Sequence, residues 1–147
     1  MQIIDRQTFI FSIDLNGLDP SQISTNINLR FTANEIILKS ISYTSENADV
    51  PDVVQIWCNI TNDGLIGSFP NGGDGNNNNV PVFQTHNEHF RLNNNSFQTG
   101  NFILQFQTTN QGEPFYYNPQ PLISTQSPTH TNGIVSITIE FVKIEIK

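Results

Sequence analysis

The strongest constraint in this sequence is an alternation of apolar and polar residues with a period of two, carried mostly by β-branched and aromatic side chains. Because successive side chains of a β-strand point to opposite faces of a sheet, this pattern predicts strands with one buried face. The clearest apolar positions are Phe9, Phe11, Ile13 and Leu15 in segment 8–15, with Ile10 as an exception on the other face; Val54, Ile56, Cys58 and Ile60 in segment 53–60; and Phe102, Leu104 and Phe106 in segment 101–108.

Two further segments predict strands with less regular faces. In segment 35–43 one face is assigned Ile37, Lys39, Ile41 and Tyr43, and the other Leu38, Ser40 and Ser42. Segment 134–146 alternates through Ile137, Ile139 and Phe141, after which the apolar positions move to Val142, Ile144 and Ile146. An extra residue in a strand shifts the alternation in this way, so we expect a β-bulge near Val142.

Turn signals and shorter strands fill most of the remaining chain. Asn-Gly and Asp-Gly dipeptides mark turns, and short strands are predicted at 65–69, 80–84 and 89–92. Asp19-Pro20 at the start of segment 19–29, with Ile23 and Ile27 four residues apart, predicts at most one or two turns of helix. About eight strands without helical spacers predict an all-β, antiparallel sandwich or barrel, treated as one domain over residues 1–147.

Charge and composition exclude several classes of function. The 6 basic and 13 acidic residues give a net charge of −7, which argues against binding nucleic acid through its phosphates. The single cysteine excludes an intrachain disulfide framework. No apolar run approaches the roughly 18 residues of a membrane span, and the first residues lack the pattern of a signal peptide. We therefore expect neither membrane insertion nor a cleaved signal.

Candidate catalytic and metal-binding groups are few. His86, Glu88 and His89 are clustered in the chain, but residues three apart on a strand point to opposite faces, and a third ligand must come from His130 or a distant acid. The segment that starts at Asp74 lacks the glycine and the acid of a calcium loop. Cys58 has no His or Lys close in sequence and is predicted to be a small core residue. We predict no catalytic residue, no metal, no cofactor and no enzymatic activity.

Two elements are the predicted contact sites. The aromatic run Phe115, Tyr116 and Tyr117 lies in a Pro-rich segment, where the rings either stack on a sugar or a partner protein or cap the open end of the core. The low-complexity segment 71–79 predicts a long exposed loop, which includes Asn71, Gly72, Gly73, Asp74 and Gly75.

The polar faces of the predicted strands use Asn, Gln, Ser and Thr in place of Lys and Glu. The chain has 20 Asn but only 13% charged residues, against roughly 25% in typical soluble domains. Neutral polar side chains lose less on burial than charges do, and lysines that protect exposed sheet edges are scarce. We therefore predict a homo-oligomer or larger shell that covers these faces. The alternative explanation for the many Asn residues is codon bias in an AT-rich genome. Because Lys is scarce in this chain, codon bias alone is an incomplete account.

Segments 31–43 (FTANEIILKSISY), 56–60 (IWCNI) and 100–106 (GNFILQF) together resemble the small single jelly-roll virion proteins of double-stranded DNA viruses, including virophages and their relatives. Members of this group serve as penton or minor capsid proteins, or as spike and fibre components. The resemblance implies eight strands in two four-stranded sheets, frequently in cyclic oligomers, and it supplies no catalytic residue.

These observations predict a structural virion protein, a single jelly-roll capsid component of penton, minor capsid or spike type that acts by self-assembly. Its expected partners are copies of itself, as a trimer or pentamer, and other capsid proteins. Its expected location is the virion, after synthesis in the host cytoplasm. The alternative is a lectin or fibre head that binds a glycan or receptor through residues 115–117. A cupin-type enzyme is a third hypothesis, which His86, His89 and His130 fit poorly.

Overall fold

The computed structural model describes residues 2–14, 22–46, 53–70, 81–110, 113–116 and 132–145, with side chains described for 2–12, 22–43, 54–69, 83–106 and 134–145. The described residues form nine strands and one short 3-10 helix. They are β1 Gln2–Asp14, β2 Gln22–Ala33, β3 Glu35–Glu46, β4 Val53–Cys58, β5 Leu65–Pro70, β6 Pro81–Arg91, η1 Asn93–Asn95, β7 Phe97–Asn110, β8 Glu113–Tyr116 and β9 Asn132–Glu145.

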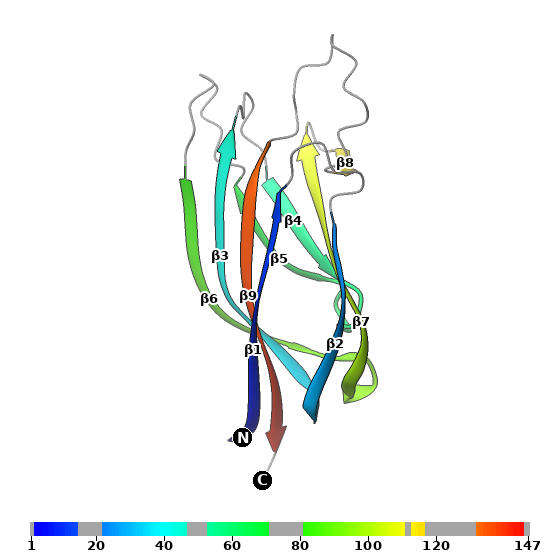
Figure 1. Cartoon of the computed structure of the whole chain (residues 1–147). Helices are drawn as coiled ribbons and strands as arrows, with labels where there is room; N and C mark the ends of the chain where they lie inside the picture. The colour runs from blue at the N-terminus through cyan, green and yellow to red at the C-terminus, as the bar shows by residue number, and fades with distance from the viewer. Residues whose placement is uncertain are drawn as a thin grey trace.

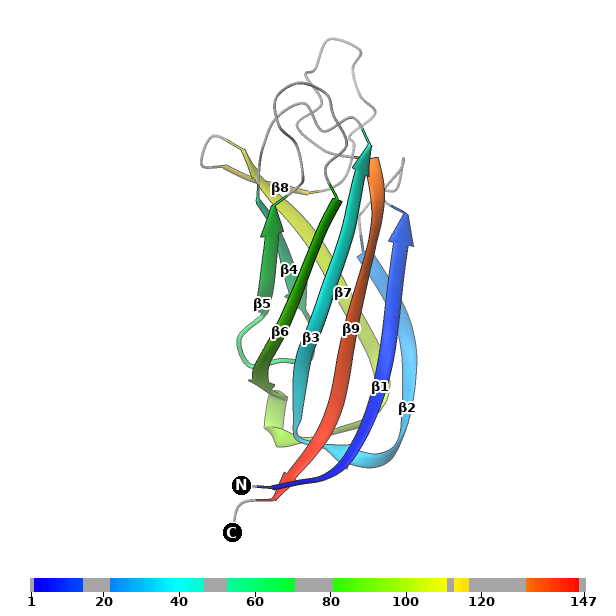
Figure 2. The same cartoon turned by 90° about the vertical axis from the view of Figure 1, so that its left-hand side faces the viewer.

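The strands form two antiparallel sheets that face each other. One sheet has the order β1-β9-β3-β6 and the other the order β2-β7-β4-β5, with β8 added beside β7. Figures 1 and 2 show both layers, with the start of β1 and the end of β9 at the same end of the sandwich. The first and last strands are neighbours, and most connections cross between the sheets, which is the strand order of a single jelly roll. The predicted all-β antiparallel sandwich is confirmed.

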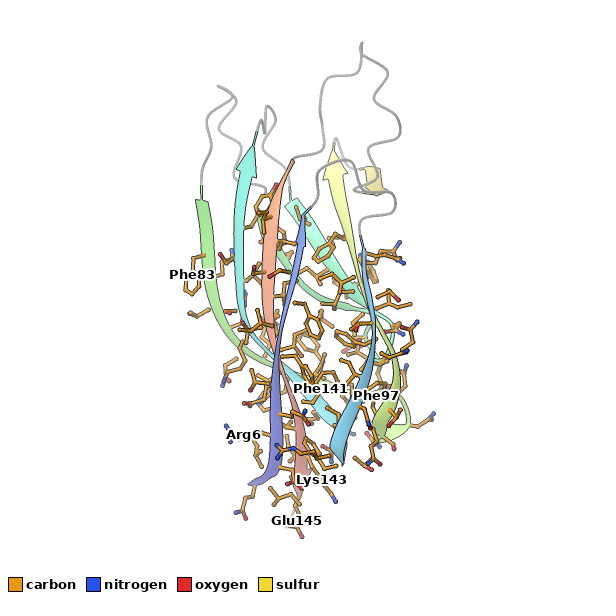
Figure 3. All side chains as sticks on the ribbon, viewed as in Figure 1. Arg6, Phe83, Phe97, Phe141, Lys143 and Glu145 are labelled. Carbon is orange, nitrogen blue, oxygen red and sulfur yellow. The ribbon has the colours of Figure 1, made fainter. Side chains whose placement is uncertain are left out.

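The core lies between the sheets at the predicted apolar positions. The inward side chains of β4 and β7, among them Val54, Ile56, Phe102 and Phe106, are fully buried. Aromatic rings join the two layers. Phe11 of β1 lies 5.0 Å from Phe102 between ring centroids, and Phe102 meets Phe141 of β9 edge to face at 5.5 Å. Figure 3 shows Phe141 between the sheets, and each such ring pair adds about 0.5–1.5 kcal/mol beyond its buried area.

The bulge expected near Val142 is wrong. β9 pairs with both neighbours without an extra residue, and the extra residues lie in those neighbours, at Ile4 of β1 and Lys39 of β3. Phe141 therefore faces the core, whereas Val142 and Ile144 lie on the outer face of the same sheet. The apolar pattern shifts because the buried face of β9 changes there: Val142 and Ile144 are buried on the outer face, while Lys143 and Glu145 on the other face are exposed.

The faces assigned to the first half of segment 35–43 are also wrong. Leu38 and Ile41 both pack in the core, while Ile37 joins Val142 and Ile144 in a second apolar cluster outside the sheet. Because Leu38 and Ile41 point inward, the bulge places Lys39 and Ser40 together on the outer face. A bulge hidden within an apolar run reverses the alternation without a turn residue to mark it.

Where the structure describes segment 19–29, the expected helical turns are absent. Residues Gln22–Ala33 are strand β2, which pairs with β7. Ile27 and Leu29 are buried and alternate with the exposed Asn28 and Arg30. Pairing with β7 satisfies the backbone groups that a single helical turn leaves free. No helix among the described residues is long and apolar enough to cross a membrane.

Two asparagine side chains extend the sheets past the ends of strands. Asn34, the one residue between β2 and β3, accepts a hydrogen bond from the Ile144 N–H at 2.9 Å and donates one to the Ile144 carbonyl at 2.8 Å. Asn59, directly after β4, accepts from the Ile103 N–H at 2.8 Å and donates to the Asn101 carbonyl at 2.9 Å. At both places a side-chain amide replaces a backbone amide where the chain leaves the ladder.

Candidate functional site

The two predicted contact sites fall mostly outside the described residues. Phe115 and Tyr116 belong to β8, whose backbone pairs with Thr108 and Gln107 of β7, but their side chains are not among those described. Outside the described residues lie Tyr117 and the loop residues Asn71, Gly72, Gly73, Asp74 and Gly75. Both contact sites therefore stay predictions.

The clustered histidines lie on β6, an edge strand, and each has a carboxylate neighbour. His86 Nδ1 is 3.5 Å from Glu88 Oε1, and His89 Nδ1 is 3.0 Å from Glu35 Oε1. His130 lies outside the described residues. Within the part of the chain that the structure describes, no three His, Cys, Asp or Glu residues lie close enough together to hold a metal ion. The histidine cluster is thus divided into two separate pairs.

Cys58 is a buried thiol in the core, as predicted. It is 5% exposed, and burial raises its pKa from 9.0 to about 11. Hydrogen bonds from the backbone of Ile60 and Thr61 act in the opposite direction but do not offset the loss of hydration. A thiol that stays protonated at neutral pH is a poor nucleophile and a poor metal ligand.

The outer face of the β1-β9-β3-β6 sheet is divided into two halves of different chemistry. The half near the chain ends carries charged groups on all four strands, among them Arg6, Lys39, Arg91 and Glu140. Glu140 is 6% exposed, and its carboxylate accepts a hydrogen bond from the Thr8 hydroxyl at 3.2 Å and lies 3.6 Å from the Arg6 guanidinium. This half therefore holds a buried carboxylate that has one cation beside it.

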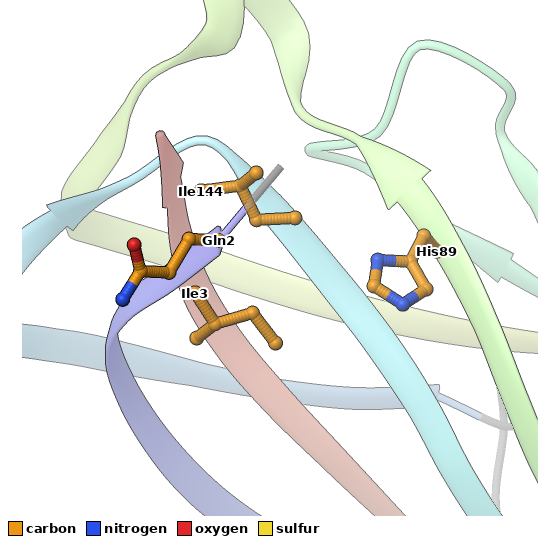
Figure 4. A pocket seen from close by; sticks show the side chains of 4 residues that line it. All are labelled: Gln2, Ile3, His89 and Ile144. Atoms are coloured by element: carbon orange, nitrogen blue, oxygen red, sulfur yellow. The ribbon is translucent and has the colours of Figure 1, made fainter. Parts of the chain in front are cut away.

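A shallow pocket of about 180 Å³ opens in the charged half (Figure 4), between β1, β9 and β6. Gln2, Ile3, His89 and Ile144 line it, and the two isoleucines belong to the outer apolar cluster. Ligand pockets for drug-sized molecules usually span about 300–1,000 Å³. The pocket suits a single apolar side chain better than a substrate, because its walls are mostly apolar and His89 is already bonded to Glu35.

The other half of this outer face has no charge on its described side chains, and we call it the hydroxyl face. Its nine members are Ile10 and Ser12 of β1, Ser40 and Ser42 of β3, Phe83 and Thr85 of β6, and Ile134, Ser136 and Thr138 of β9. The strand register places Ser12, Ser136, Ser42 and Phe83 in one row across the four strands. The Ser12 and Ser136 hydroxyls lie 2.8 Å apart and bond to each other.

The hydroxyl face also holds the most exposed large apolar side chains among the described residues. Ile10 is 70% exposed, Phe83 69% and Ile134 56%. Figure 3 shows Phe83 projecting from β6 away from the sandwich. Serine and threonine side chains separate these three residues, so the face is a candidate contact surface with scattered apolar groups and not one continuous apolar patch.

The sequence contained part of the signal for this face. Ile10 breaks the alternation between Phe9 and Phe11, and the prediction placed it on the outer side. Ile134 was missed, although extending the alternation of Ile137 backwards along β9 places it outside. Phe83 was missed because the short predicted strand that contains it gave no phase, and only its pairing with Ser42 fixes its direction.

Comparisons with known proteins identify no family. No family model matches the chain, and no curated protein matches its sequence. Similar solved chains include the extra small virus VLP of the giant freshwater prawn Macrobrachium rosenbergii, with 11% identity over 97% of this chain and 80% of that chain and a TM-score of 0.35. Desmodium yellow mottle tymovirus has 14% identity over 97% and 90%, with a TM-score of 0.30. Infectious bursal disease virus, strain Gx, has 12% identity over 92% and 37%, with a TM-score of 0.29. Identity and TM-score are low in all three, so the fold assignment rests on the strand order.

Proposed function

We propose that this chain is a structural virion protein, a jelly-roll capsid component that acts by self-assembly. The observation that carries the proposal is the hydroxyl face. A jelly roll is shared by viral capsid proteins, lectins and cupins, so the fold alone does not choose among them. A face with exposed Ile10, Phe83 and Ile134 favours burial against a neighbouring protein, because covering its described side chains removes apolar surface from water and desolvates no charge among them.

In this proposal residues 1–147 act as one domain of penton, minor capsid or spike type. The chain forms a trimer or pentamer with itself and contacts other capsid proteins, after synthesis in the host cytoplasm. Closed rings repeat one pair of surfaces around an axis, so every subunit buries the same residues. The low share of charged residues in the chain suits such repeated burial.

The test is the mass of the full chain in solution, measured by sedimentation equilibrium and native mass spectrometry over a wide range of protein concentration. A trimer or pentamer, or closed particles seen by electron microscopy, is the expected result. A chain that stays monomeric at the highest concentration and binds a defined sugar on a glycan array overturns the proposal. That outcome supports the lectin or fibre-head alternative, in which residues 115–117 are the contact.

A further inference from the structure

We propose that the hydroxyl face is a contact between two copies of this chain, which meet face to face across a two-fold axis. The inference deepens the proposed function, on which it rests, by naming a surface and its partner; this two-fold contact joins two subunits and differs from the contact that closes a trimer or pentamer. Two copies related by a two-fold axis present the same patch to each other, so the patch must be able to pack against an identical patch. A patch with charges of one sign fails this condition; the nine described side chains of the hydroxyl face have none, and Asp14, whose backbone pairs with Ile134, is at the end of β1 beside the face.

Charge also decides how the two copies are oriented. The chain carries a net charge of −7, so copies repel each other at long range. The charged half of the same sheet face holds Arg6, Lys39 and Glu140, and stacking two such halves removes these charged groups from water at a cost in free energy. A two-fold axis that crosses the strands avoids this, because the hydroxyl faces overlap while the charged halves point away from each other.

This orientation gives a residue-level expectation. Ser12, Ser136, Ser42 and Phe83 form one row across the sheet. An axis along this row places Phe83 opposite Phe83 of the second copy. Two phenyl rings, each 69% exposed in the free chain, then cover each other. The hydroxyl pair of Ser12 and Ser136 is already bonded within one copy, so the contact buries it without leaving both groups unpaired.

The size of the patch predicts a weak contact. Each outward residue covers about 6.8 Å along its strand and about 4.8 Å across it, or roughly 33 Å². Nine such residues present roughly 300 Å² per copy, against roughly 800 Å² per partner in a stable specific complex. The isolated pair is therefore expected to form only at high protein concentration. Within an assembly, other contacts hold the two faces close, which raises their effective concentration.

The first experiment measures self-association of the full chain by sedimentation velocity up to nearly millimolar concentration. Phe83→Asp and Ile10→Asp each place a carboxylate in the patch, and Leu65→Asp is the matched control on the opposite sheet, where Leu65 is 40% exposed. We expect association to strengthen from about 0.05 M to about 0.5 M salt, as the net charge is screened. Phe83→Asp and Ile10→Asp are expected to weaken it at least about ten-fold, and Leu65→Asp to leave it unchanged. Circular dichroism and urea midpoints of each variant confirm that it is folded.

A second experiment tests the two-fold geometry. In a Cys58→Ala background, Phe83→Cys is oxidised with copper phenanthroline, which removes the two thiol hydrogens and joins two copies through one disulfide. We expect rapid covalent dimers from Phe83→Cys and few from Leu65→Cys. Equal cross-linking of both variants, or equal loss of association from Leu65→Asp and Phe83→Asp, overturns the inference.

The outcomes separate this inference from the proposed function. Rings or particles that form unchanged in Phe83→Asp leave the capsid role in place and remove the hydroxyl face as its contact. A two-fold dimer that depends on Phe83 but never grows into rings or particles keeps the contact and overturns the capsid role. A wild-type chain without self-association at any concentration or salt overturns both.

Discussion

Replacing Asn34 with alanine tests whether a side chain completes the sheet where the chain crosses from one layer to the other. The wild-type amide makes two hydrogen bonds to Ile144, of 2.9 Å with its N–H and 2.8 Å with its carbonyl, both partly buried. Alanine leaves both backbone groups without a partner. A buried polar group without a partner costs about 1–3 kcal/mol, so two partly buried groups at the lower end give a loss of about 2–3 kcal/mol.

Asn59→Ala is the matched control, because Asn59 makes the same pair of bonds to Ile103 and Asn101, but at an exposed place. Water replaces the lost partner there, so the expected loss is about 1 kcal/mol or less. Asn34→Asp gives a second comparison. Its carboxylate still accepts from the Ile144 N–H but opposes the Ile144 carbonyl, so this variant is expected to recover stability at acidic pH, where the protonated acid donates again.

Urea unfolding followed by circular dichroism measures these differences. With a slope of about 2 kcal/mol per molar urea, Asn34→Ala is expected to lower the midpoint by about 1 M and Asn59→Ala by less than half of that. Hydrogen exchange of the Ile144 amide is expected to accelerate in Asn34→Ala. Equal midpoints for the two alanine variants, or a loss below about 0.5 kcal/mol for Asn34→Ala, refute the reasoning that the amide replaces a rung of the ladder.

Three further changes test the core. Gly67→Ala is expected to cost about 1–3 kcal/mol in urea unfolding, because a Cβ there lies 2.9 Å from Leu38 Cδ2; unchanged stability contradicts this close approach of the sheets. Phe141→Ala is expected to cost about 3–5 kcal/mol and Phe83→Ala less than about 0.5, and similar losses for both contradict the burial pattern. Native Cys58 is expected to resist iodoacetamide at pH 8 until the chain unfolds. Its raised pKa predicts stability that is complete below pH 9 and declines as pH rises through about 11, a decline that Cys58→Ala is expected to lessen.

Where one face of a strand is buried throughout, the sequence was sufficient to predict it. In β4 and β7 apolar residues occupy every second position from Val54 to Cys58 and from Phe102 to Phe106, and all of these positions are buried, although Trp57 and Ile103 add apolar residues to the other face. Alternation is reliable there because a slip of one residue turns the whole apolar set outward. The strand order could not be predicted from the sequence. An alternation with a period of two indicates which face of a strand is buried, but it does not indicate which strand lies beside it.

The errors occurred where the buried face changes along a strand. In β3 the extra residue at Lys39 reverses the phase, and in β9 an apolar residue on each face imitates such a reversal. The two cases give the same sequence signal, a pair of adjacent apolar residues. Only the pairing with neighbouring strands separates them, because a bulge is a mismatch between two strands and not a property of one.

The position of the candidate contact surface also depends on pairing between strands, so the sequence alone did not locate it. The low charge predicted that some face is covered by another copy, but it did not say which one. In the β2-β7-β4-β5 sheet, neutral side chains bond to each other across strands. The Ser24 hydroxyl donates to Asn101 Oδ1 at 3.2 Å, and the Thr99 hydroxyl donates to Asn28 Oδ1 at 2.9 Å.

Asparagine content and low charge therefore have separate physical consequences. Asn34 and Asn59 close the ladders at the corners, and Asn94 and Asn95 adopt positive φ values of 57° and 53° in the turn before β7, which Asn tolerates better than most residues do. These asparagines stabilise the backbone structure, and their roles do not involve an exposed apolar surface. The hydroxyl face differs, since serine and threonine accompany exposed isoleucine and phenylalanine there. A neutral composition is thus compatible with a solitary domain, and the proposed assembly rests on the register, which brings Ile10 and Phe83 onto one face whose described side chains are uncharged.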